Sequence, residues 1–184
     1  SWVLFYNRSV LEEYDLELPE TFDEFMDQCE MLEEEGIYPI GNVYDSPPGW
    51  QSIIMPMELL VRTDLEYYNK LRKGEGSWTS DTVVEAFEIW KEMLEKGFFP
   101  PFDWSGSKLA SEFAQGNVAY IPMGSWFIGF LKPQDYATLD KVGMTEMPAI
   151  TPKGEGVMIV EACNIMAPKK SKNAEAAREW LKWW

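Results

Sequence analysis

Apolar and polar residues are arranged along this chain in patterns that predict both strands and helices. An apolar run within residues 1–7 predicts a strand. Between residues 21 and 36 the apolar positions lie three or four apart, which is the spacing of an amphipathic helix. Thr21 and Glu24 can form a capping box at the start of this helix, and Gly36 can end it.

The same rules extend the prediction through the first half of the chain. Residues 37–40 are a short strand candidate, and the Pro- and Gly-containing stretch 42–50 has the composition of a loop. An apolar helix is expected over 53–61. The clearest helix starts at Ser80, its expected N-cap, and ends at Gly97.

The second half of the chain continues the alternation of helices and strands. A helix around Leu109 and Phe113 leads into a strand over 118–123 and a Gly-Ser-Trp turn that ends at Trp126. The remaining expected elements are strands over 142–147 and 157–166, a turn over 151–156 and a helix after Asn173. Elements that alternate in this way indicate an α/β architecture.

The charge balance and the absence of histidine exclude several functions. With 31 acidic and 16 basic residues, the formal net charge of −15 repels nucleic-acid phosphates, so we expect no nucleic-acid partner. The chain has no histidine, which removes histidine-dependent nucleophiles and the commonest zinc ligand. The Gly-Glu-Gly turns at 74–76 and 154–156 place a carboxylate where a phosphate would bind. The residues therefore predict no metal and no cofactor.

The two cysteines are far apart in the sequence and lie within predicted elements. Cys29 falls on the apolar side of the helix over 21–36, and Cys163 falls within the strand over 157–166. We expect buried thiols rather than a disulfide. The chain also has neither a signal peptide nor an apolar run of membrane-spanning length, and we expect it to be incomplete at both ends.

Carboxylates in aromatic or apolar surroundings are the first group of candidate site residues. Asp45 and Asp103 lie in loops beside aromatic residues, and Glu161 lies within an apolar strand. A carboxylate inside a buried strand is costly unless it is paired, so Glu161 could be a general acid or an acceptor for ligand hydroxyls. It could equally be an outward-facing strand residue.

Tryptophans in loops form the second and stronger group. Trp50 and Trp126 each lie at a junction between a loop and a helix, and Trp104 lies in the aromatic loop 98–107. Stacked rings together with ionised acceptors are what a neutral polyol requires, because its C–H faces are apolar and its rim is polar. Each tryptophan could instead pack in the core.

At this point the sequence resembles a known family, the bacterial extracellular solute-binding proteins of family 1, which are carbohydrate receptors of ABC importers. The resemblance rests on motifs in order: L-F-Y-N-R-S-V-L at 4–11, P-E-T-F-D-E-F at 19–25, G-I-Y-P-I at 36–40, F-A-Q-G-N-V-A-Y with G-S-W at 113–126, and S-K-N-A-E-A-A at 171–177. Each motif is weak alone, but their order and spacing extend over nearly the whole chain.

The resemblance implies a periplasmic-binding-protein type II-like α/β fold, mainly of the second (C-terminal) lobe, with a mixed sheet flanked by helices. Residues 1–156 would form most of this lobe, and residues 157–184 would be a strand and a helix that return toward the N-terminal lobe. Trp126 matches the family's stacking tryptophan, and Trp50 matches an aromatic position on the loop that enters the cleft. Glu161 lies near the strand that crosses between the lobes.

The function implied is that of a non-enzymatic receptor that binds a mono- or oligosaccharide and delivers it to the permease subunits of an ABC transporter. We expect a monomeric, extracellular protein, either a membrane-anchored lipoprotein or a periplasmic protein. We expect this chain alone to bind sugar weakly or not at all, because half of the cleft would be absent. The alternatives are a glycoside hydrolase with paired carboxylates and an interaction domain without a small ligand.

Overall fold

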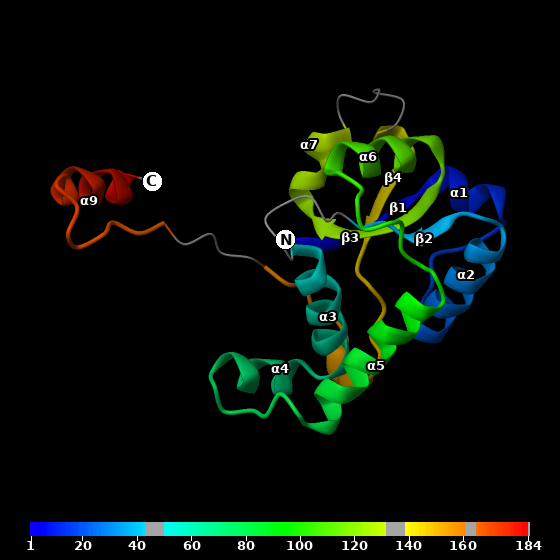
Figure 1. Ribbon diagram of the computed structural model, residues 1–184, viewed down its shortest axis with the longest axis horizontal. Helices are drawn as coiled ribbons and strands as arrows, with labels where there is room; N and C mark the ends of the chain where they lie inside the picture. Colours follow the sequence, from blue (N-terminus) through cyan, green and yellow to red (C-terminus); the bar gives the residue numbers. More distant parts are fainter. Residues whose placement is uncertain (43–49, 132–138, 161–164, 184) are drawn as a thin grey trace.

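A computed structural model shows a mixed four-stranded sheet with helices on both faces (Figure 1). It describes residues 1–42, 50–131, 139–160 and 165–183, with only the backbone described for 50–53. The strands are β1 (Trp2–Asn7), β2 (Tyr38–Ile40), β3 (Val118–Gly124) and β4 (Val142–Thr145), in the spatial order β2-β3-β1-β4. This arrangement confirms the predicted α/β class with a mixed sheet.

The pairing of the strands brings several chain ends to one edge of the sheet. β1 runs antiparallel to both β3 and β4, and Trp2 at its start lies opposite Gly124 at the end of β3. β2 runs parallel to β3, with Tyr38 opposite Val118. The carboxyl ends of β2, β3 and β4 and the amino end of β1 therefore point toward the same edge.

Two apolar clusters cover the two faces of the sheet. Leu4 belongs to the first cluster and its neighbour Phe5 to the second, because successive residues of a strand point to opposite faces. The first cluster is covered by α2 (Phe22–Glu34), α3 (Trp50–Thr63), α4 (Leu65–Arg72) and α5 (Asp81–Glu95). The second is covered by α6 (Gly106–Gln115) and α7 (Ile128–Leu131), which Figure 1 shows on the opposite side of the sheet from α3 and α5.

The helix ends predicted from caps and glycines are confirmed. Thr21 and Glu24 form a complete capping box at the start of α2, and the Ser80 side chain caps α5. Gly36 and Gly97, which follow these two helices, have φ values of 79° and 76°. Gly116 ends α6 with φ 88°, a left-handed conformation that favours glycine.

Two short helices were not predicted, and a polar side chain caps each of them. α1 (Arg8–Glu13) follows β1 directly, and the Asn7 side chain accepts hydrogen bonds from the amides of Ser9 (3.0 Å) and Val10 (3.4 Å). The same side chain, which is buried, donates to the Phe113 carbonyl at 2.6 Å. Asp64 caps α4 by accepting from the Tyr67 amide at 2.9 Å.

The strand predicted over 157–166 is wrong for the residues that the structure describes. Residues 157–160 and 165–166 have no regular structure, and Val160 and Met166 are largely exposed. The apolar run suggested a strand, but a strand requires a ladder of bonds to a neighbour. In residues 157–160, the Ile159 carbonyl accepts a hydrogen bond from the Trp2 amide at 2.9 Å.

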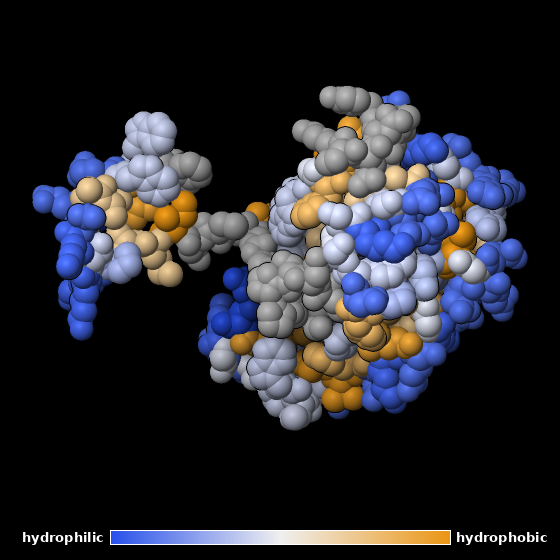
Figure 2. Space-filling view, turned by 45° about the horizontal axis from the view of Figure 1, so that its top comes forward, coloured by the Kyte–Doolittle hydropathy of each residue, from blue (hydrophilic) through white to orange (hydrophobic). Residues whose placement is uncertain are grey.

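The predicted last helix is confirmed as α9 (Ala174–Trp183). The Asn173 carbonyl accepts from the Ala177 amide at 3.0 Å, which starts the helix at the expected residue. Figure 1 shows α9 apart from the main body, and none of its described residues is buried. Figure 2 shows its apolar and hydrophilic side chains on different sides of the helix.

The end of α3 contains a buried ion pair and contacts the segment that follows β4. The Arg62 guanidinium is 2% exposed and lies 3.4 Å from a Glu58 carboxylate oxygen. Burial raises the pKa of Glu58, and the charge and hydrogen bond of Arg62 partly offset this rise. The Arg62 carbonyl accepts from the amides of Ile150 (3.0 Å) and Thr151 (3.2 Å). The end of α3 therefore anchors the chain between β4 and residue 157.

Cys29 is a buried free thiol in α2, as the sequence predicted. Burial raises its pKa well above the ordinary value. Cys163 lies outside the described residues. Among the helices of the described ranges, none is both long enough and apolar enough to cross a membrane.

Candidate ligand-binding site

Trp126 lies at the sheet edge where the carboxyl ends of the strands meet. It follows β3 directly, within a short 3₁₀ turn over Ser125–Phe127. Its side chain is 46% exposed, while the neighbouring Trp2 is 4% exposed. The two rings meet edge to face, with centroids 5.4 Å apart and planes at 83°. Trp2 therefore holds the Trp126 indole in place and leaves almost half of Trp126 to solvent.

Gly124 makes this placement of the indole possible. A Cβ atom at residue 124 would lie 2.0 to 2.3 Å from three carbons of the Trp126 ring, far inside van der Waals contact. The ring therefore lies directly against the backbone at the end of β3. The Gly-Ser-Trp sequence contained this signal, because a glycine two residues before a large ring permits close approach.

The other predicted site residues of this edge fall mainly outside the described residues. Asp45 and Glu161 lie in the ranges 43–49 and 161–164, and for Trp50 the structure describes only the backbone at the start of α3. β2 runs toward the edge before residue 43, and the Ile159 carbonyl is bonded to the Trp2 amide before residue 161. Just before residue 43 and just before residue 161, the chain therefore runs toward the Trp126 edge.

Trp104 lies in the loop that leads into α6. Its ring meets the Tyr38 ring edge to face at 5.2 Å, and the Lys108 ammonium lies 5.3 Å from its centroid. The Trp126 ring instead meets the Trp2 ring. Trp104 and Trp126 therefore contact different residues of the fold.

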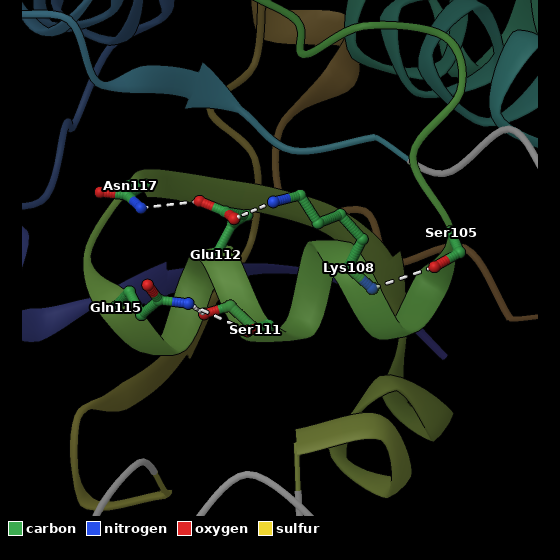
Figure 3. A network of polar contacts seen from close by, with 6 residues as sticks. All are labelled: Ser105, Lys108, Ser111, Glu112, Gln115 and Asn117. Atoms are coloured by element: carbon green, nitrogen blue, oxygen red, sulfur yellow. Dashed lines mark hydrogen bonds and ion pairs between the residues drawn. The ribbon is translucent and has the colours of Figure 1, made fainter.

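Lys108, which lies beside the Trp104 ring, belongs to a polar network along α6 (Figure 3). Lys108 bonds the Glu112 carboxylate, and the Asn117 side chain donates to Glu112 at 2.6 Å. These two hydrogen bonds, from Lys108 first and then Asn117, lower the pKa of Glu112. The Asn117 amide also donates to the Glu112 carbonyl at 2.9 Å, so the network fixes the turn from α6 into β3.

The described residues include no group of three or more His, Cys, Asp or Glu side chains that could hold a metal ion. What the described residues offer at the Trp126 edge is an aromatic surface. An indole that is fixed at its edge and open to solvent can stack on a flat, partly apolar ligand.

Comparison with known proteins places this geometry in context. The family model described as "Bacterial extracellular solute-binding protein" matches residues 1–184. An uncharacterized ABC transporter extracellular-binding protein of Pyrococcus horikoshii is 25% identical over 181 residues, which are 96% of this chain and 40% of that protein.

Solved structures share the fold at low sequence identity. A chitin oligosaccharide binding protein has a TM-score of 0.73 and 22% identity, over 84% of this chain and 39% of its own. A sugar transporter protein from Bacillus licheniformis, in complex with stachyose, has a TM-score of 0.67 and 18% identity, over 99% of this chain and 49% of its own. These likenesses confirm the type II periplasmic-binding-protein fold. The chain spans less than half the length of these relatives.

Proposed function

Because this chain belongs to the bacterial extracellular solute-binding protein family, we propose that it is part of a sugar receptor of an ABC importer. The observation that carries the proposal is the half-exposed Trp126 indole at the carboxyl edge of the sheet. Ligands of open α/β folds gather at this kind of edge. The structural relatives that bind a chitin oligosaccharide or stachyose support a saccharide as the ligand class.

In this proposal Trp126 stacks on the apolar face of a sugar ring, and neighbouring groups bond the hydroxyls of its rim. Trp50 provides a second stacking surface, and Asp45 and Glu161 accept hydrogen bonds from the hydroxyls. Trp104 was predicted as a further ligand residue, but in this proposal it supports the fold, because Tyr38 and Lys108 contact its ring. The receptor binds and releases the sugar without chemistry.

The lobe division expected from the sequence is part of the same proposal. Residues 1–156 form most of one lobe, and residues 157–184 contribute to the other lobe of the complete protein. Closure of the lobes around the sugar changes the surface offered to the permease subunits. The receptor acts outside the cytoplasmic membrane as a monomer, either lipid-anchored or free in the periplasm.

A thermal-shift screen of the complete receptor against mono- and oligosaccharides tests the proposal. A ligand that binds only the folded state adds about 2.7 kcal/mol to the free energy of unfolding at a concentration of 100 Kd. This added stability raises the unfolding midpoint. We expect at least one neutral saccharide to raise the midpoint and amino acids or peptides to leave it unchanged. A midpoint that responds to peptides and to no saccharide would contradict the proposal.

A further inference from the structure

Two residues, Trp2 and Gly124, lie against the Trp126 ring. Neither of them needs to contact a ligand. Trp2 lies opposite Gly124 in the β1–β3 pairing, so the two residues meet directly below the indole. We propose that Trp2 and Gly124 are positioning residues that set the orientation of the Trp126 ring for stacking. This inference rests on the proposed function, because it assigns the residues that prepare the stacking surface.

Gly124 acts through the absence of a side chain rather than through backbone freedom. Its φ of −69° and ψ of 151° are extended values that any L-residue adopts. A Cβ atom would meet the Trp126 ring at Cζ3 (2.0 Å), Cη2 (2.1 Å) and Cε3 (2.3 Å). The three nearest atoms all belong to that one ring, so alanine at 124 displaces the indole and leaves the strand conformation allowed.

Trp2 acts through its fixed position beside the indole. Its amide donates to the Ile159 carbonyl at 2.9 Å, and the carbonyl of the preceding residue, Ser1, accepts from the Ser125 amide at 2.9 Å. The Trp2 ring packs in the second apolar cluster, and the buried Arg62 and Glu58 lie nearby around a void of about 10 Å³. A ring held in this way provides a rigid wall against which Trp126 can adopt only a limited range of orientations.

The edge-to-face contact between Trp2 and Trp126 favours one orientation of the Trp126 ring. Two aromatic rings prefer perpendicular or offset arrangements, because the positive edge of one is attracted to the negative face of the other. The observed 83° angle between the Trp2 and Trp126 planes has this geometry. Phenylalanine at position 2 can preserve an edge-to-face contact, whereas leucine cannot.

The orientation of the ring can be measured without any ligand. In the 184-residue chain labelled with 5-fluorotryptophan, the ¹⁹F resonance of Trp126 is assigned as the signal lost in Trp126→Phe. We expect Gly124→Ala and Trp2→Leu to shift this resonance and Trp2→Phe to keep it near its original position. Gly129→Ala is the matched control, because a Cβ at Gly129 meets nothing within 4 Å.

Stability separates positioning from a general packing role. Gly124→Ala is expected to leave the unfolding midpoint unchanged or slightly raised, since alanine reduces the entropy of the unfolded chain. A Trp126 resonance that stays in place in both Gly124→Ala and Trp2→Leu would overturn the inference. A shifted Trp126 resonance in Gly124→Ala, together with an unfolding midpoint that does not fall, supports the inference.

Sugar titration of the complete receptor distinguishes this inference from the proposed function. With stachyose and a chitin oligosaccharide as probes, we expect Gly124→Ala to weaken binding by about tenfold, the loss of much of one aromatic contact. If neither sugar binds the unaltered receptor while the ring shifts as expected, the positioning stands and these sugars are not its ligands. If Gly124→Ala binds a sugar as tightly as the unaltered receptor, the positioning is wrong and the receptor function remains.

Discussion

Trp104 and Trp126 are the two predicted stacking tryptophans whose side chains the structure describes, and their indoles have different surroundings. Trp104, in the loop before α6, has an aromatic partner in Tyr38 and a cationic partner in Lys108. Trp126, after β3, has Trp2 on one side, and almost half of its surface remains open. The sequence predicts both as ligand residues, and only the structure shows their different partners.

The difference shows how an aromatic residue is used for stability or kept available for binding. Beside Trp104, Lys108 is paired with Glu112, which also accepts a hydrogen bond from Asn117 at the turn into β3. Around Trp126 the fixed elements lie beneath and beside the ring, and its outer face is left open. Burial of a ring stabilises the fold, whereas a rigid and exposed ring can stack on a ligand.

The largest expected effect lies where β1 ends and α1 begins. Asn7→Ala removes the N-cap of α1 and leaves the buried Phe113 carbonyl without its bond, which together cost about 2–4 kcal/mol of stability. Urea unfolding of the chain measures this loss. Asn7→Asp keeps the cap but places a buried carboxylate oxygen against the Phe113 carbonyl, so it should lose at least as much stability as Asn7→Ala. A loss below about 1 kcal/mol for Asn7→Ala would contradict the account.

Exchange of each tryptophan for alanine compares the two positions directly. Trp104 is half-buried between two partners, so we expect Trp104→Ala to cost about 2 kcal/mol of stability. Trp126→Ala should cost less than about 1 kcal/mol, because much of its ring is already in water. Both values come from urea unfolding of the same chain. Equal losses at the two positions would remove the distinction between them.

The smallest expected effect concerns the charges around Trp104. Glu112→Gln replaces a charge-assisted contact by a neutral one, with an expected loss of about 1 kcal/mol or less near pH 7. Because the folded pKa of Glu112 is lowered, its contribution is present above the unfolded pKa of about 4.3 and is lost as the pH falls through the folded pKa.

Unfolding curves measured from pH 7 down through this acidic range check the sign of that prediction. The unaltered chain should lose more stability on acidification than Glu112→Gln does, so the two curves converge at low pH. A Glu112→Gln chain that loses as much stability as the unaltered one would show that the carboxylate contributes nothing through its charge.

Much of the fold could be predicted from local signals in the sequence. The capping box at Thr21, the Ser80 cap and the glycines at 36 and 97 gave helix ends that the structure confirms. These signals act within one turn of helix and do not depend on the rest of the fold. α1 was not predicted, because six residues are too few for a clear period and its cap, Asn7, also ends a strand.

Long-range features were the ones that sequence patterns could not determine. The run over 157–166 is as apolar as a strand, but no pattern within it says whether a neighbouring strand is present to pair with it. Trp2 was predicted as a strand residue, and its contact with Trp126 depends on the pairing of β1 with β3, two segments more than a hundred residues apart. The different partners of Trp104 and Trp126 could not be predicted for the same reason.

The most direct test of the account is isothermal titration of the complete receptor with the saccharide that most raises its unfolding midpoint. Three proteins are compared: the unaltered receptor, Trp126→Ala and Trp104→Ala. The account predicts that Trp126→Ala loses about 1–3 kcal/mol of binding free energy, as expected for an aromatic contact. Trp104→Ala should bind as the unaltered receptor does, once its lower stability is allowed for. Unchanged affinity in Trp126→Ala, or a larger loss in Trp104→Ala, would contradict the assignment of the stacking surface to Trp126.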